Sequence, residues 1–362
     1  MKLSKKIRVL KNIVSSIAAY RRGKIVLPYL PTALWIEPTN ICNLRCLMCP
    51  NSLKRQKKYG YMKINLYRKI INEAKDFASH IVLCISGEPL LSPSLCEMVT
   101  LAKKAGLSVY LSTNATILSP ALSKKLLSAG LDWINFSFDG CDKKTYENIR
   151  RGADFDKTLQ NIIGFLKIKK ALGAKTRTEL QILVMDEKGR RSLKSNLSSF
   201  KKRFLGLPLD CLQVRTPSTW GKFFLKTKMF SPKKPGRRFS PCSYLWGSLH
   251  FLFDGRVVAC TSDFFGENVL GKFPEKSLVE IWNDKPMQNF RRAMLRKKYL
   301  RFNKNCEGCD SLWEKPILGL PAGLRGICAS SFSSVFGQGF MGIFKRAAKL
   351  FNRDFSMEVV GD

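Results

Sequence analysis

Three cysteines stand close together near the start of the chain, at Cys42, Cys46 and Cys49, in the spacing C-x3-C-x2-C. Cysteine thiolates are the usual protein ligands of iron–sulfur clusters. Three thiolates on one short loop can hold three irons of a [4Fe-4S] cluster and leave the fourth iron without a protein ligand. A small molecule can then coordinate that iron. The spacing therefore predicts a cluster with one open coordination site.

Two other uses of cysteine compete with the cluster. Zinc prefers four closed ligands, such as a C-x2-C pair with a second pair or two histidines, and the next histidine is His80. Disulfides suit oxidising compartments, whereas this chain is expected in the cytosol because no segment reaches the length of a transmembrane span. Lys11, Asn12, Ser15 and Ser16 break the early apolar stretch, which argues against a signal peptide.

The run Cys42-Asn-Leu-Arg-Cys46, with Pro50 directly after Cys49, resembles the radical S-adenosylmethionine (SAM) superfamily. The resemblance implies that the amino and carboxylate groups of SAM bind the open iron. One electron from the cluster then splits the sulfonium into methionine and a 5′-deoxyadenosyl radical, which abstracts a hydrogen from the substrate. The cofactor brings this radical chemistry. The implied reductant is a flavodoxin- or ferredoxin-type protein.

A second group of cysteines comprises Cys242, Cys260, Cys306 and Cys309. Cys242 is followed by twelve residues, Gly255, four residues and Cys260, and a C-x2-C pair comes later. This order resembles the SPASM extension of the superfamily in a shortened, twitch-type form, since Lys315 and Gly319 stand where further cysteines are usual. The resemblance implies one auxiliary [4Fe-4S] cluster that transfers electrons. The spacing by itself also permits a structural zinc site.

Short apolar runs alternate with amphipathic stretches of helical length through the first two thirds of the chain. The predicted strands are 34–38, 81–85, 108–112, 133–138, 178–184 and 211–215, and the predicted helices between them are 66–78, 92–105, 119–129, 156–172 and 189–204. This alternation indicates a parallel sheet with right-handed crossovers. Six units make an α/β fold, a partial (β/α)6 barrel, also usual in the superfamily. A hairpin at 253–260 and a helix at 277–284 predict a small α+β iron–sulfur extension.

Polar motifs follow the predicted strands at their carboxyl ends, where function gathers in parallel α/β folds. The cysteine loop follows the first strand. The other motifs are Ser86-Gly87-Glu88-Pro89 after the second strand, Thr113-Asn114 after the third, Ser137-Phe-Asp139-Gly140 after the fourth and Arg215 at the end of the sixth. A chance cysteine triplet would not predict this arrangement.

The resemblance gives these motifs roles around SAM. Ser86-Gly87-Glu88 is similar to the G-G-E-P motif, which offers backbone carbonyls and a carboxylate to the amino group of SAM, although Ser86 replaces the first glycine. An arginine after the fourth strand suits the carboxylate of SAM, and the motif leaves the choice between Arg150 and Arg151 open. The implied cofactor-binding residues are Met48, Ser86, Gly87, Glu88, Thr113, Asn114, Ser137, Asp139 and Arg151. Arg215 is the catalytic candidate, and no general base is assigned.

The charge of the chain is strongly positive, with 63 Lys and Arg against 27 Asp and Glu, a net charge of +36. The excess is concentrated in residues 1–31, 221–239 and 291–304, which contain no acidic residue. Such a field favours anionic partners, either an anionic substrate or a membrane surface. Sequence-specific nucleic-acid binding is not expected, because no known motif and no interleaved aromatic residues accompany the charge.

Two basic amphipathic stretches, 5–20 and 340–352, predict helices of ambiguous role. In the first, Ile7, Leu10, Ile13, Val14 and Ile17 share one helical face. Such a helix either lies on the inner face of a membrane or covers the edge of a domain. Residues 316–337 are rich in Gly and Ser and predict a linker.

The predicted domains are a basic amphipathic segment (1–32), the partial barrel (33–220), the auxiliary-cluster domain (240–312) and a basic tail (313–362). The favoured function is a radical SAM oxidoreductase that modifies an unactivated C–H bond in a peptide, a carbohydrate or a lipid-linked metabolite. The alternative is a zinc-stabilised scaffold that binds nucleic acid or a membrane.

Overall fold

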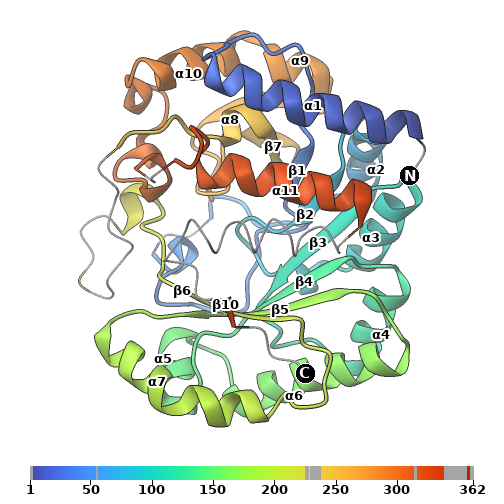
Figure 1. Ribbon diagram of the computed structural model, residues 1–362, viewed down its shortest axis with the longest axis vertical. Coiled ribbons are helices and arrows are strands. Elements are labelled where there is room, and N and C mark those ends of the chain that lie inside the picture. The colour runs from blue at the N-terminus through green and yellow to red at the C-terminus, as the bar shows by residue number, and fades with distance from the viewer. Residues whose placement is uncertain are drawn as a thin grey trace.

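One curved sheet organises the molecule. The computed structural model describes residues 3–53, 56–224, 228, 238–313, 316–337 and 357–358. Within these residues the strand order is β10-β6-β5-β4-β3-β2-β1-β7-β8-β9, where β10 is the short strand Met357–Glu358, and the outermost strands do not pair with each other. The sheet therefore forms an open, partial barrel with helices on its outer face (Figure 1). This confirms the predicted α/β fold class.

Six strands build the barrel and pair in parallel with their neighbours, and each of the first five is followed by one or two of the outer helices. The strands are β1 (Ala33–Ile36), β2 (His80–Leu83), β3 (Ser108–Thr113), β4 (Trp133–Ser137), β5 (Arg177–Leu183) and β6 (Cys211–Arg215), and the helices are α2 (Ile64–Ala74), α3 (Leu95–Lys104), α4 (Pro120–Ser128), α5 (Lys143–Ile149), α6 (Phe155–Ala171) and α7 (Glu187–Lys202). Each predicted strand and helix of this region is found, with small shifts of its ends. The short helix α5 was not predicted.

Side chains alternate across the barrel strands. On β5, Leu180 and Ile182 are buried in the core beneath the outer helices, while Glu179 and Gln181 lie on the other, concave face. Side-chain oxygens close the amino ends of several helices, and Asp154 accepts a hydrogen bond from the Lys157 N–H at the start of α6. The sequence thus separates an apolar outer layer from a polar inner surface.

Aromatic rings cover the concave face near the amino ends of the strands. Tyr110 stacks on His80 at 5.0 Å between ring centroids, and it meets Trp133 at 5.1 Å. Its hydroxyl also reaches α11 (Ala322–Phe336), where it lies 3.0 Å from the Ser334 hydroxyl. Burial lowers the pKa of His80 to about 3, so this histidine is neutral and belongs to the packing. The inner surface is therefore closed at one end by rings and a helix.

The C-terminal extension continues the same sheet. Strand β7 (Ser248–Phe251) pairs in parallel with β1, and β8 (Arg256–Val258) and β9 (Val269–Lys272) follow as antiparallel strands. Gly255 forms the predicted hairpin turn with φ +87°, and a Cβ there would lie 2.3 Å from the Phe273 carbonyl oxygen. The helices of the extension are α8 (Tyr244–Gly247), α9 (Leu278–Asn283) and α10 (Lys285–Leu295).

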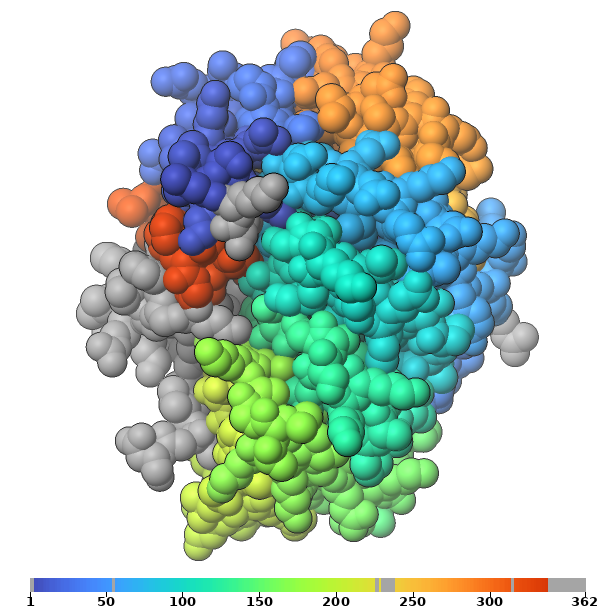
Figure 2. Space-filling model, turned by 90° about the vertical axis from the view of Figure 1, so that its right-hand side faces the viewer, coloured from blue at the N-terminus to red at the C-terminus, as the bar shows by residue number. Residues whose placement is uncertain are grey.

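The N-terminal helix α1 (Leu3–Arg21) and α11 lie side by side, as Figure 2 shows in dark blue and red. The prediction of a linker over 316–337 is wrong for the fifteen residues of α11, because Leu324, Ile327 and Val335 are buried at helical spacing. The basic stretch 340–352 lies outside the described residues. In the described part of the chain, no helix has the length and apolar character needed to cross a bilayer, and the cytosolic location stays a prediction.

Candidate functional site

The loop with Cys42, Cys46 and Cys49 follows β1 and is fixed from both sides. The Leu47 N–H donates to the Ile149 carbonyl at 2.9 Å, which ties the loop to the end of α5. The three thiols lie within electrostatic range of one another, since Cys46 influences the pKa of both other thiols. The loop therefore presents its three cysteines together, as the spacing predicted.

Burial keeps these thiols protonated in the absence of a metal. It raises the pKa of Cys42 to about 11 and that of Cys49 to about 12. Iron must therefore displace protons when it binds, which is the ordinary coupling of metal binding and thiol ionisation. Protonated thiols in the metal-free protein are therefore compatible with cluster binding, because the thiols lose their protons when iron binds.

The second motif packs directly against the cysteine loop. The Glu88 N–H donates to the Ile41 carbonyl at 2.8 Å. A Cβ on Gly87 would lie 2.2 Å from the Thr39 carbonyl oxygen, so only glycine permits this approach. The Ser86 carbonyl accepts a hydrogen bond from the Asn51 amide, which follows the last cysteine. The Ser86-Gly87-Glu88 motif thus lies against the cysteine loop and also stabilises its conformation.

Glu88 is 3% exposed and its carboxylate is fully engaged. It accepts hydrogen bonds from the Thr113 hydroxyl at 2.6 Å, the Asn114 N–H at 2.8 Å and the Leu90 N–H at 3.1 Å. Burial raises the pKa of Glu88, and these donors oppose the shift. The Asn114 amide then donates to the Asn43 side chain within the cysteine loop at 3.0 Å. Three of the predicted cofactor-binding residues therefore form one network that orders the loop.

Arg150, not Arg151, lies against the cysteine loop. Arg150 is 9% exposed, and its guanidinium donates to Asp139 at 2.7 Å and to the Cys46 sulfur at 3.7 Å. The other oxygen of Asp139 accepts from the Leu183 N–H at 2.9 Å. Arg151 is exposed, and only its carbonyl touches the loop, by accepting from the Arg45 N–H at 3.0 Å. Arg150 thus links Asp139 to Cys46, because its guanidinium donates to both.

Burial and charge compete at this pair. Burial raises the pKa of Asp139, and the guanidinium opposes that shift. Burial also disfavours the charged form of Arg150, but Asp139 and Cys46 more than offset it and raise the pKa of Arg150 above its ordinary value. The guanidinium is therefore charged, and the pair is a buried ion pair.

The remaining predicted residues lie around the same edge of the barrel. Met48 is buried within the cysteine loop and packs with Met185 and Phe224. Ser137 is half-buried at the end of β4, on the concave face. Arg215, at the end of β6, is more distant from the loop and lies 3.9 Å from Glu179.

Glu37, which the sequence interpretation did not single out, joins the barrel to the extension. It follows β1 directly and is 1% exposed. Its carboxylate accepts hydrogen bonds from the Ser86 hydroxyl and from the Phe253 N–H, the latter at 3.1 Å. Burial raises its pKa to about 7. The available signal in the sequence was an acidic residue at the end of an apolar strand, but the sequence does not show which groups Glu37 contacts.

We expect Glu37→Gln to remove a pH dependence of stability. The folded-state pKa of about 7 exceeds the ordinary 4.5, so the folded chain binds more protons between these values and loses stability as pH rises through them. The wild type should lose up to about 3 kcal/mol relative to the variant over this window. Chemical denaturation at each pH measures the difference, and parallel stability curves would show that Glu37 does not titrate this way.

Four further cysteines gather in the extension. Cys260 and Cys309 each influence the pKa of Cys306, and Cys242 is within range of both. Burial raises the pKa of Cys260 to about 11 and that of Cys309 to about 12. The four predicted auxiliary ligands therefore face one another.

A zinc ion and an iron–sulfur cluster place different demands on a set of thiols. Zinc with thiolate bonds of about 2.3 Å requires sulfurs about 3.8 Å apart, whereas a cubane cluster binds each thiolate at a separate iron. Both cysteine sets fit iron–sulfur clusters.

A loop from the barrel joins the two cysteine sites. The Thr219 hydroxyl donates to the Gly308 carbonyl at 2.9 Å, beside Cys309. Five residues later, Phe224 packs with Cys46 and Met48. Gly221 allows the passage, since its φ is +62° and a Cβ would overlap the Asn305 carbonyl. The sequence interpretation missed this loop.

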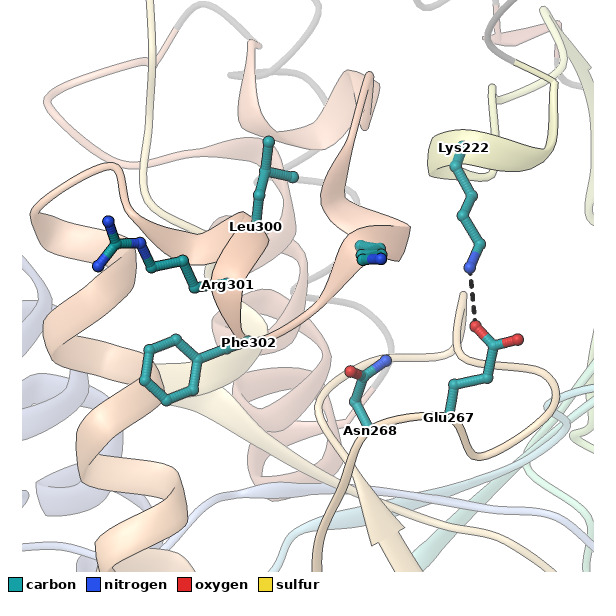
Figure 3. A pocket seen from close by; sticks show the side chains of 7 residues that line it. Lys222, Glu267, Asn268, Leu300, Arg301 and Phe302 are labelled. Carbon is teal, nitrogen blue, oxygen red and sulfur yellow. Dashed lines mark hydrogen bonds and ion pairs between the residues drawn. The ribbon is translucent and has the colours of Figure 1, made fainter.

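A cavity of about 250 Å³ lies mainly within the extension, and no cysteine is among the residues that line it. Its lining residues are Lys222, Glu267, Asn268, Leu300, Arg301, Phe302 and Lys304. Lys222 and Glu267 point toward each other and form an ion pair of 2.8 Å (Figure 3). The cavity is predominantly basic and is separate from the motifs at the strand ends.

Family models match both parts of this arrangement. The model of the radical SAM superfamily matches residues 36–176, and that of the iron–sulfur cluster-binding domain SPASM matches residues 242–310. The chain therefore contains a radical SAM domain followed by a SPASM domain. Its cofactors are accordingly SAM and a [4Fe-4S] cluster, with an auxiliary iron–sulfur site in the SPASM domain.

Curated relatives share parts of this radical SAM protein. The AdoMet-dependent heme synthase of Methanosarcina barkeri is 32% identical over 38% of this chain and 40% of its own. The PqqA peptide cyclase of Gluconobacter oxydans is 25% identical over 74% of this chain and 81% of its own. The chain thus spans less than half the length of the heme synthase.

The fold is similar to that of solved structures. Native anSMEcpe with bound AdoMet superposes with a TM-score of 0.55 at 17% identity, covering 88% of this chain and all of that one. At this identity the likeness shows a shared fold.

Proposed function

We propose that this radical SAM protein cleaves SAM reductively and abstracts a hydrogen from an unactivated C–H bond. The observation that carries the proposal is the loop of three facing cysteines, held at a strand end by the Ser86-Gly87-Glu88 motif. When bound, the cluster supplies the electron that converts SAM into methionine and the 5′-deoxyadenosyl radical. The protein itself must bind SAM, orient it and exclude competing reactions.

The chain's own residues fit these tasks. Gly87 keeps the motif close to the cysteine loop, and Glu88 orders the loop through Asn114 and Asn43. We propose that Ser86, Gly87 and Ser137 contact SAM directly, while Glu88 and Asp139 act through the groups that they hold. Arg150 places a positive charge beside Cys46, and hydrogen bonds to cluster sulfurs are one means of tuning a cluster's potential.

The net reaction that we propose is a two-electron oxidation. A substrate radical that loses a proton leaves one electron, and the auxiliary cluster of the SPASM domain can accept it. The loop from Thr219 to Phe224 supports this electron transfer, because it contacts both cysteine sites.

The test of the proposed SAM cleavage is anaerobic incubation of the protein with SAM and a chemical reductant. Formation of 5′-deoxyadenosine supports the proposed cleavage, and its absence from cluster-loaded protein would overturn it.

We propose that the concave face of β4 to β6 binds the substrate. Register places Asn135 beside Glu179, and Gln181 beside Gln213, on neighbouring strands. Arg215 adds a cation 3.9 Å from Glu179. Within the described residues, the carbonyl oxygens of the Asn135 and Gln213 amides are buried without a hydrogen-bond partner. Such oxygens are costly unless a ligand donates to them.

These groups support a polar substrate with O–H or N–H donors. A peptide, a carbohydrate and the polar head of a lipid-linked metabolite all have such donors. The similarity to a PqqA peptide cyclase makes a peptide the first candidate to assay. Arg215 suits an anionic group on the same substrate.

If Gln213 serves the substrate, the substrate-free protein should gain stability from Gln213→Leu. The change removes a buried amide oxygen without a hydrogen-bond partner, on a side chain that is 4% exposed, and the expected gain is about 1 kcal/mol. The control is Asn283→Leu, because Asn283 accepts from the Leu27 N–H at 3.0 Å and donates to its carbonyl at 2.8 Å. Chemical denaturation compares them, and equal destabilisation of both variants would make Gln213 structural.

We propose an acidic flavodoxin- or ferredoxin-type protein as the reductant. The net charge of +36 favours association with such a partner, and salt would weaken it. The alternative of a zinc-stabilised scaffold is less favoured, because it leaves the motifs around the first cysteine loop without a role.

A further inference from the structure

Helix α1 carries an exposed apolar stripe that the fold does not use. At 100° per residue, Leu3, Ile7 and Val14 fall within about 40° of one another around the helix axis. Their exposed fractions are 72%, 58% and 66%. The opposite face of α1 is buried against α11 through Val9 and Ile13. The stripe is therefore not part of the helix–helix contact.

The apolar face that the sequence predicted for this helix is therefore only partly buried. Ile13 is buried, and Leu10 and Ile17 are half-buried against α11, whereas Ile7 and Val14 face outward. The helix thus does cover part of the fold, and it still has apolar side chains left over.

Exposed apolar side chains concentrate around this helix. Among the described residues, the six most exposed large apolar side chains are Leu318, Leu3, Leu205, Val14, Ile7 and Val26. Only Leu205 is far from α1. Leu318 is 82% exposed, and its carbonyl accepts from the Arg21 guanidinium at 2.7 Å, at the end of α1. Arg21 shares the azimuth of Leu3, so Leu318 extends the stripe.

The stripe is framed by positive charge. Lys11 and Arg8 are exposed on one side of it, and Arg21 stands at its end. Helix α1 contains no acidic residue. The acid near its amino-terminal half is Asp76, which acts on Lys5. An apolar strip between basic side chains is the pattern of a helix that lies in a membrane interface.

We propose that the exposed face of α1, with Leu318, docks on an anionic membrane surface. The apolar side chains enter the headgroup region, and the nearby Lys and Arg side chains are attracted to the anionic lipids. A second copy of the same surface would bring like charges together, which disfavours a self-association site. The proposed docking does not depend on the proposed reaction, and it would bring the protein close to substrates at a membrane.

Sedimentation with lipid vesicles tests the proposal on the full, cluster-loaded chain. We expect it to pellet with phosphatidylcholine vesicles that contain about one third phosphatidylserine at about 50 mM salt, and to be released at about 500 mM salt. Ile7→Gln with Val14→Gln should weaken binding about tenfold or more, since both side chains lose their apolar contact with lipid. Leu205→Gln, equally exposed elsewhere at 68%, should leave binding unchanged.

Three outcomes would overturn the proposal. The chain could stay in the supernatant with anionic vesicles at low salt. The double variant and Leu205→Gln could bind alike, which would assign binding to other parts of the chain. Sedimentation velocity could show a dimer that the double variant loses, which would make the stripe a protein interface. Circular dichroism and 5′-deoxyadenosine formation should be unchanged in each variant, which excludes loss of folding as the cause.

Discussion

Replacement of Cys42, Cys46 and Cys49 with Ala is expected to abolish SAM cleavage while leaving about four irons on the chain, the content of one [4Fe-4S] cluster. The physical reason is the separation of the two thiol sets. Cys46 influences the pKa of its two loop neighbours, whereas the auxiliary thiols influence one another. Iron analysis and 5′-deoxyadenosine formation after anaerobic reconstitution measure the two effects.

The converse variant sharpens this experiment. Replacement of all four auxiliary cysteines should leave SAM cleavage in place and remove about four irons. Cys328→Ala is the matched control, because Cys328 is half-buried in the α1–α11 contact and lies 4.0 Å from the Ser16 hydroxyl. It should keep both clusters. Zinc in the auxiliary site, or SAM cleavage by the triple variant, would contradict the assignment.

The order of strands and helices could be predicted because each element carries its own signal. The strand Cys211–Arg215 was predicted to the residue, since its apolar run is short and lies between turns. The first strand ends at Ile36, one residue before Glu37 and two before Pro38, which has no N–H for the ladder. Helix α11 was missed because its Gly and Ser content suggested a linker, while packing against α1 decides its conformation.

The grouping of the cysteines was also predictable, because Cys42, Cys46 and Cys49 share one short loop and the SPASM pattern joins Cys242 and Cys260 to the later Cys306 and Cys309. Their role as cluster ligands stays a prediction. The partners of single polar residues were not predictable. The motif could not distinguish Arg150 from Arg151, since only the turn of the backbone after α5 decides which one points to Asp139. Glu37 and Gln213 depend likewise on strands that are distant in sequence. Sequence therefore gives the type of site, and tertiary contacts give its supporting residues.

The buried ion pair between Asp139 and Arg150 should be among the strongest couplings in the protein. The side chain of Asp139 is fully buried, and that of Arg150 is 11% exposed. Asp139→Asn leaves the guanidinium buried without a counter-charge, and Arg150→Met leaves the carboxylate in the same position. Each change should cost about 3–5 kcal/mol of stability, because an unpaired buried charge is strongly unfavourable.

The double variant distinguishes the interaction between the two charges from the separate loss of stability that each substitution causes. Asp139→Asn combined with Arg150→Met removes both charges, so its loss of stability should be clearly smaller than the sum of the single losses. The exposed pair of Lys143 and Asp156 is the control: its side chains are 58% exposed each and 3.2 Å apart, and its coupling should be far smaller because water screens an exposed ion pair. Chemical denaturation of the wild type, the three variants and the control cycle measures both couplings. Additive losses at Asp139 and Arg150 would show that the two charges do not stabilise each other and that Asp139 does not hold the guanidinium beside Cys46.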